Sequence, residues 1–148
     1  MAWFEATHTD SFTVPADLDT TRTHFSDLAT IVAQTEGLES HDINGDTVHF
    51  VLELQDHGVV KFKGDYKCTY ALEGDELKWT SAGGNTLQSG KIVFKAASEG
   101  TQVDYTETVK VDLDVAMVMA TMLKPVMGPL MVHEMKGFVK RMTKSLPA

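Results

Sequence analysis

The chain has 148 residues, of which 43% are hydrophobic and 23% charged, and its formal net charge is −8. That length and composition predict one globular domain over residues 1–148 and exclude a disordered or fibrous chain. The acidic balance argues against a nucleic-acid partner, because phosphate backbones carry charge of the same sign.

The single cysteine, Cys68, can form neither an internal disulfide nor a thiolate metal site. The six histidines show no metal-ligand spacing. No basic segment followed by an apolar stretch opens the chain, as it would in a signal peptide. We therefore expect a cytoplasmic protein without a metal or another cofactor.

Charge and methionine are unevenly distributed along the chain. Residues 1–114 contain 20 acidic and 8 basic residues, whereas residues 115–148 contain 5 basic residues and one acid, Glu134. Seven of the eight methionines also lie after residue 114. No linker separates the two segments, so we interpret the second as one element of the same domain that needs burial.

The first third of the chain predicts a strand and two short helices. Residues 3–14 alternate apolar and polar side chains, which is typical of a half-buried strand. Residues 16–35 have a helical pattern with a break near Ser26-Asp27, and Asp17 is suited to cap the first helix.

The middle of the chain predicts an antiparallel meander. Six runs with a period of two lie between residues 37 and 112 and are separated by turns. Asn44-Gly45 is a strong signal for a two-residue hairpin turn. Charged residues alternate with apolar ones in these runs, so one face of the sheet is expected to meet solvent.

The last segment predicts a long helix. After Asp114 the apolar residues recur with helical spacing to the end of the chain. We expect Asp112 or Asp114 to cap its start. Pro125 and Pro129 each lack a backbone donor, which predicts a kink or a break around residues 124–128.

This order of elements resembles the helix-grip fold of the START/Bet v 1-like superfamily, also called SRPBCC. The resemblance covers the whole chain. Within the superfamily, the polyketide-cyclase-like proteins and the family of the carbon monoxide dehydrogenase accessory subunit look nearest. The segments that carry the resemblance are Phe12-Thr13-Val14-Pro15-Ala16, Phe25-Ser26-Asp27-Leu28, Gly100-Thr101-Gln102-Val103-Asp104-Tyr105 and Phe138-Val139-Lys140-Arg141-Met142.

The resemblance implies an α+β domain in which a curved antiparallel sheet of about seven strands wraps around the long C-terminal helix. Two short helices follow the first strand, and an apolar cavity lies between sheet and helix. Members of the superfamily bind lipids, sterols, polyketides or other hydrophobic small molecules, and some catalyse with a few polar groups in that cavity.

We therefore expect this chain to bind a hydrophobic small molecule or a lipid, and we favour binding over catalysis. One alternative is an enzyme similar to polyketide cyclases and dehydratases. Another is an accessory or assembly protein with a protein partner, similar to the accessory subunit of the carbon monoxide dehydrogenase system.

Ten aromatic and methionine side chains are the expected ligand contacts. They lie on the inward phase of the predicted strands or on the methionine-rich last helix, where flexible thioethers adapt to irregular ligands. The alternative interpretation is that the methionines only fill a core, as an apolar stripe at helical spacing commonly does. The expected contacts are Phe50, Phe62, Tyr66, Trp79, Phe94, Tyr105, Met119, Met122, Met127 and Met131.

Three polar residues on inward phases are candidate catalytic groups: His8, Asp10 and Glu107. The family arrangement makes the first and last strands neighbours, which would bring these side chains together. A buried carboxylate beside an imidazole is a candidate acid–base pair. We favour the competing interpretation, in which a bulge or a sheet end turns these groups to water.

Residues 115–132 form an apolar run that barely reaches membrane-spanning length and is interrupted by Lys124, Gly128 and two prolines. We therefore expect a core helix and at most a peripheral membrane contact. Basic residues near its end would favour anionic lipid, although they also suit the helix dipole. These residues are Lys136, Lys140, Arg141 and Lys144.

Overall fold

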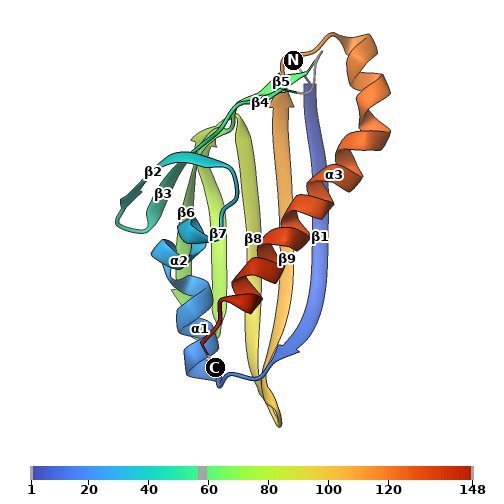
Figure 1. Ribbon diagram of the computed structural model, residues 1–148. Helices are drawn as coiled ribbons and strands as arrows, with labels where there is room; N and C mark the ends of the chain where they lie inside the picture. Colours follow the sequence, from blue (N-terminus) through green and yellow to red (C-terminus); the bar gives the residue numbers. More distant parts are fainter. Residues whose placement is uncertain (1, 57–59, 148) are drawn as a thin grey trace.

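The computed structural model describes residues 2–56 and 60–147, in which a curved seven-stranded antiparallel sheet lies against a long C-terminal helix (Figure 1). The spatial order of the strands is β1-β9-β8-β7-β6-β3-β2. The sheet consists of β1 (Ala2–Val14), β2 (Leu38–Asn44), β3 (Thr47–Leu52), β6 (Asp65–Glu73), β7 (Glu76–Gly84), β8 (Thr86–Ala97) and β9 (Gly100–Leu113). The short strands β4 (Gln55–Asp56) and β5 (Lys61–Phe62) form a separate pair.

Two short helices follow β1 and are separated where the sequence predicts a break. They are α1 (Leu18–Ser26) and α2 (Leu28–Ala33). Asp17 Oδ1 accepts a hydrogen bond from the backbone N–H of Thr20 at 2.7 Å, which confirms the predicted cap. Asp27 repeats this arrangement for α2, where its Oδ2 accepts from the N–H of Thr30 at 3.2 Å.

The first hairpin of the meander is confirmed, but its turn is displaced by one residue. Asn44 pairs with Thr47, so the loop consists of Gly45 and Asp46. Gly45 has a φ of 62°, and no non-glycine residue in the described chain has a positive φ. Glycine at the first central position is what a type II′ turn requires, so a type I′ turn at Asn44-Gly45 is wrong.

The C-terminal helix α3 (Met117–Lys144) crosses the sheet obliquely, from the β1 edge toward α1 (Figure 1). It is continuous through Pro125 and Pro129, and Figure 1 shows its axis changing direction in the first half. The two missing N–H donors therefore produce a bend and no break. The predicted cap is also wrong, because Ala116 occupies the N-cap position without a side-chain hydrogen bond.

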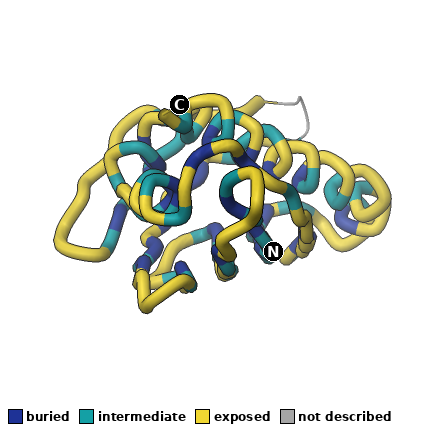
Figure 2. The backbone as a smooth tube through the Cα atoms, turned by 90° about the horizontal axis from the view of Figure 1, so that it is seen from below, coloured by how far each residue is buried: buried dark blue, intermediate teal, exposed yellow. Residues whose placement is uncertain are grey.

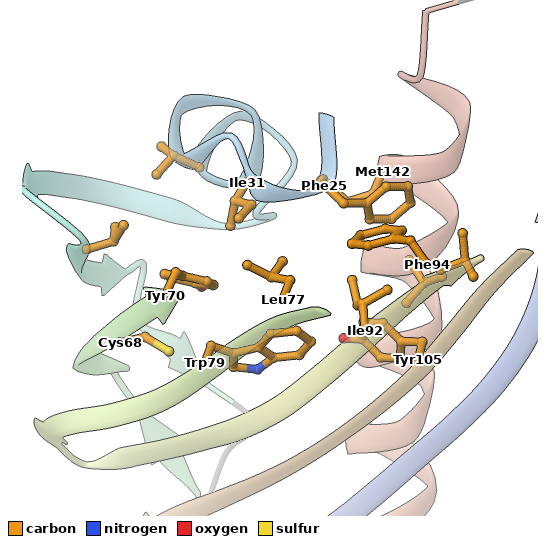
Figure 3. Close-up of a cluster of buried hydrophobic side chains, with 14 of the residues drawn as sticks. Phe25, Ile31, Cys68, Tyr70, Leu77, Trp79, Ile92, Phe94, Tyr105 and Met142 are labelled. Carbon is orange, nitrogen blue, oxygen red and sulfur yellow. The ribbon is translucent and has the colours of Figure 1, made fainter. Parts of the chain in front are cut away.

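The core has two parts, both on the inner face of the sheet. Buried and exposed residues alternate along the strands, as Figure 2 shows in the colour of the tube. One cluster joins the sheet to α1, α2 and the end of α3, where Phe25, Phe94 and Met142 meet (Figure 3). The other joins β1 and β9 to the middle of α3, with Phe4 and Met131 among its members.

Gly90 permits a close approach between three strands. It pairs with Trp79 of β7 on one side and with Glu107 of β9 on the other. A Cβ at this position would clash with the carbonyl oxygen of Thr106 and would lie 2.5 Å from Cζ2 of Trp79. The missing side chain therefore leaves room for the Trp79 indole to extend over β8 toward β9.

We expect Gly90→Ala to lower the free energy of unfolding by about 1–3 kcal/mol, because the new methyl group overpacks a filled site. Urea titration followed by circular dichroism measures this. The matched control is Gly137→Ala in α3, where the added Cβ meets only the flexible end of Arg141 at 3.0 Å. That change should be neutral or stabilising by up to about 1 kcal/mol. Wild-type stability of Gly90→Ala would show that the indole is not held this closely.

Candidate functional site

A cavity of about 500 Å³ lies between the inner face of the sheet and α3. This volume is within the range of small-molecule sites in proteins, roughly 300–1,000 Å³. Strands β3 and β6 to β9 form its floor, α1 and α2 supply Phe25 and Ile31 at one end, and the second half of α3 forms its roof. Most of the lining side chains are aliphatic or aromatic, so the cavity suits an apolar occupant.

The structure brings seven of the ten expected ligand contacts to the cavity wall. Five of them are aromatic residues of the sheet and of β5, and two are methionines of α3 facing them. These residues are Phe50, Phe62, Tyr66, Trp79, Tyr105, Met127 and Met131.

The other three expected contacts lie outside the lining. Phe94 is 1% exposed and packs against Phe25 beneath α1, with ring centroids 6.0 Å apart. Met119 is half-buried at the start of α3, and Met122 is 65% exposed. Ala120 faces the sheet, and a residue two positions further along a helix points to the opposite side.

The inward face of α3 instead continues from Met127 and Met131 to Met135, Phe138 and Met142. The spacing of four residues from Met127 to Met135 signals this face in the sequence. Which of the interleaved methionine rows faces the sheet depends on the packing angle of the helix, and periodicity does not supply that angle.

The outward face of α3 is apolar in its first half. Val118, Met122 and Val126 are spaced four residues apart and are all exposed. Such an exposed stripe is what an accessory role with a protein partner would require. No helix among residues 2–56 and 60–147 is long and apolar enough to cross a membrane.

One buried carboxyl group, that of Glu107, lies in the cavity wall. Its residue is 8% exposed, and both oxygens accept hydrogen bonds. The Trp79 indole Nε1–H donates to Oε2 at 3.0 Å, and the Tyr105 hydroxyl donates to Oε1 at 2.9 Å. Figure 3 shows Trp79 and Tyr105 side by side on the inner face of the sheet, and their ring centroids are 5.7 Å apart.

Burial raises the pKa of Glu107 from 4.5 to about 7, because desolvation penalises the charged carboxylate more than the two hydrogen bonds favour it. The pKa of Tyr105 also lies well above its usual value, through burial and the neighbouring Glu107. Near neutral pH the site therefore contains a carboxyl group that changes protonation readily beside a phenol that does not ionise.

A second polar pair lies near Glu107 on the cavity wall. The side-chain amide of Gln88 donates to the Tyr66 hydroxyl at 3.3 Å. Ser81 stands behind this pair, where its hydroxyl donates to the backbone carbonyl of Gln88 at 3.0 Å. Gln88 and Tyr66 line the cavity, so its polar groups gather on the strands of the floor.

The three candidate catalytic residues do not form one group. His8 is the register partner of Glu107 in the β1–β9 pair and is buried, with its ring centroid 6.1 Å from that of Tyr105. Its Nε2 has no hydrogen-bond partner in the described part of the chain, and it does not line the cavity. Asp10 is exposed, and its Oδ1 accepts from the N–H of Ser11 at 2.8 Å. The expectation that these groups turn to water is therefore correct for Asp10 and wrong for His8 and Glu107.

Neither a metal cluster nor a reactive thiol accompanies the cavity. No three His, Cys, Asp or Glu side chains gather around one point within the described ranges. Cys68 is buried in the sheet, and desolvation raises the pKa of its thiol to about 12. A thiol with that pKa is a small core residue and a poor nucleophile.

Comparison with solved structures identifies the fold. TTHA0849 from Thermus thermophilus matches with a TM-score of 0.69 and 17% identity, over 95% of this chain and 94% of that one. The Zhui aromatase/cyclase from Streptomyces sp. R1128 matches with a TM-score of 0.66 and 8% identity, over 98% and 94%. Norcoclaurine synthase from Thalictrum flavum matches with a TM-score of 0.60 and 15% identity, over 99% and 96%.

The chain has the START/Bet v 1-like fold. This confirms the helix-grip architecture that the order of elements predicts. No protein-family model and no curated protein matches the sequence. Identities this low establish the arrangement of the backbone, and the occupant of the START/Bet v 1-like cavity must be argued from this chain's own side chains.

The raised pKa of Glu107 predicts a specific dependence of stability on pH. The folded protein holds this proton more tightly than the unfolded chain, so the stabilisation is complete below about pH 4.5 and is lost as the pH rises through about 7. Glu107→Gln removes the ionisation while keeping the shape. The variant should therefore gain on wild type by a few kcal/mol between about pH 5 and about pH 8 in urea titrations.

The matched control for this prediction is Glu134→Gln, which removes an exposed carboxyl from the cavity rim. Its stability difference from wild type should stay constant over the same pH range. Parallel pH profiles for wild type and Glu107→Gln would contradict the proposed ionisation of Glu107.

Proposed function

We propose that this protein binds a hydrophobic small molecule or a lipid in the cavity between the sheet and α3. The observation that carries this proposal is a space of about 500 Å³ with a largely apolar wall in the middle of the domain. A norcoclaurine synthase variant with the same fold holds a transition-state analogue, which supports the fold's suitability as a container for small molecules.

The energetics favour an occupant. Apolar surface transferred from water contributes about 25 cal/mol per Å², and a cavity without an occupant forfeits the dispersion contacts of its wall. Met127, Met131 and Met135 form much of the roof. Their side chains are flexible and polarizable, so the roof can adapt to the shape of a ligand.

The exposed lining residues indicate where a ligand enters. Glu36, Gln55, Leu130 and Glu134 line the cavity and reach solvent. They belong to the segment after α2, to β4 and to α3, which together form a rim along one side of α3. A ligand would enter past this rim with the aromatic floor beneath it.

An enzyme similar to polyketide cyclases is the second candidate, and Glu107 is the observation that favours it. A buried carboxyl with a pKa of about 7 is suited to proton transfer at neutral pH. The two candidates differ in what leaves the cavity. A binding protein releases its ligand unchanged, whereas an enzyme releases a product, and mass spectrometry of the recovered ligand distinguishes these outcomes.

The cavity predicts binding of a neutral apolar probe, N-phenyl-1-naphthylamine, with one molecule per chain and a rise in probe fluorescence. Met127→Trp places a larger side chain in the cavity roof and should weaken this binding at least about 10-fold, which corresponds to about 1.4 kcal/mol. Met122→Trp makes the same change on the outward face of α3 and should leave the affinity unchanged. Equal losses in both variants, or no probe binding by wild type, would refute a ligand site at this place.

A further inference from the structure

The charged side chains of the cavity are unbalanced. Three of the four in the described lining are carboxyls, those of Glu36, Glu107 and Glu134, and the fourth is the guanidinium of Arg141. Neither lysine nor histidine lines the cavity in the described ranges. The wall therefore presents more negative than positive groups to an occupant.

Arg141 is already engaged at the α2 end of the cavity. Its Nη1 lies 3.0 Å from Glu36 Oε2, and its Nε donates to the carbonyl oxygen of Gln34 at 2.8 Å. The guanidinium would have to give up the Glu36 carboxylate to hold an anionic ligand. A ligand carboxylate or phosphate consequently finds no uncommitted cation in the described wall.

Glu107, in contrast, retains capacity to accept hydrogen bonds. A carboxylate oxygen can accept about two hydrogen bonds, and each oxygen of Glu107 receives one from the protein. The remaining acceptor positions suit the N–H groups of an amine. The rings of Trp79 and Tyr105 lie beside this carboxyl, and aromatic faces also attract ammonium groups.

The surroundings of Glu107 do not supply a cation of their own. Trp79 from β7 and Tyr105 from β9 are neutral donors, and Gly90 of β8 between them has no side chain. His8, its register partner on β1, lies outside the cavity lining. A buried carboxylate without a counter-ion is costly, and a bound ammonium group would remove that cost.

We propose that the ligand of this cavity is a hydrophobic amine, whose nitrogen donates hydrogen bonds to Glu107 while its apolar body lies under the methionines of α3. This rests on the proposed function of the cavity and adds the chemical class of its ligand. A fatty acid of the same length is disfavoured, because its carboxylate would face the carboxyls of the wall without an available cation.

Displacement of N-phenyl-1-naphthylamine by three ligands of equal chain length tests this at pH 7.5. The ligands are decylamine, decan-1-ol and decanoic acid, each used below the concentration at which it aggregates. Hydrogen bonds between charged groups contribute about 1.5–3 kcal/mol, so decylamine should displace the probe from wild type at about 10- to 100-fold lower concentration than decanoic acid. Decan-1-ol should fall between them.

Two variants assign the preference to a residue. Glu107→Gln should bind the probe and decan-1-ol as wild type does and should lose at least about 10-fold of the preference for the amine over the alcohol. Glu134→Gln removes the same charge from the rim and should keep that preference, which separates a specific contact from the general charge of the wall.

The outcomes distinguish the two proposals. If neither the probe nor decan-1-ol enters wild type, both the ligand site and its amine class are overturned. If both enter while the acid binds as well as the amine, or while Glu107→Gln keeps the preference, only the amine class is overturned. An equal loss of preference in Glu134→Gln would likewise overturn the assignment to Glu107.

Discussion

A single helix cannot cover seven strands, and this constraint determines the interior of the protein. Strands spaced about 4.8 Å apart make a seven-stranded sheet roughly 30 Å wide, whereas a helix with its side chains is about 10 Å across. The curved sheet brings its edges around α3, and α1 and α2 close one end (Figure 1). The space that none of the three helices fills is the cavity, and its wall is the inner face of the sheet.

Within that space the polar chemistry depends on a row of residues across four strands. Trp79, Gly90, Glu107 and His8 follow one another on β7, β8, β9 and β1. The absent side chain of Gly90 lets the indole reach over β8 and donate to Glu107. Removing either donor would leave a buried carboxyl with an unsatisfied oxygen, which explains why the site needs both an indole and a phenol.

The sequence alone predicts the elements well because each has a local cause. The alternation of β1, the capping aspartates Asp17 and Asp27 and the helical spacing after Asp114 all lie within a few residues of what they specify. The continuity of α3 through Pro125 and Pro129 does not follow from local rules, because tertiary packing on both sides of the prolines holds the bent helix together.

The site is less predictable than the fold for the same reason. Glu107 could be placed on the inward phase of its strand, but its contacts with Trp79 depend on the register of three strands and on the missing side chain at Gly90. The methionines of α3 show a similar limit. The sequence contains several overlapping rows of them, and the angle at which α3 crosses the sheet selects Met127 over Met122.

The central claim is that the space under α3 is a ligand site, and a crystal structure of the protein grown with N-phenyl-1-naphthylamine tests it most directly. The account predicts probe density between Trp79 on the floor and Met127 in the roof, with the sheet and α3 otherwise unchanged. Density for the probe on the outward face of α3, or an interior closed by rearranged methionine side chains, would contradict it.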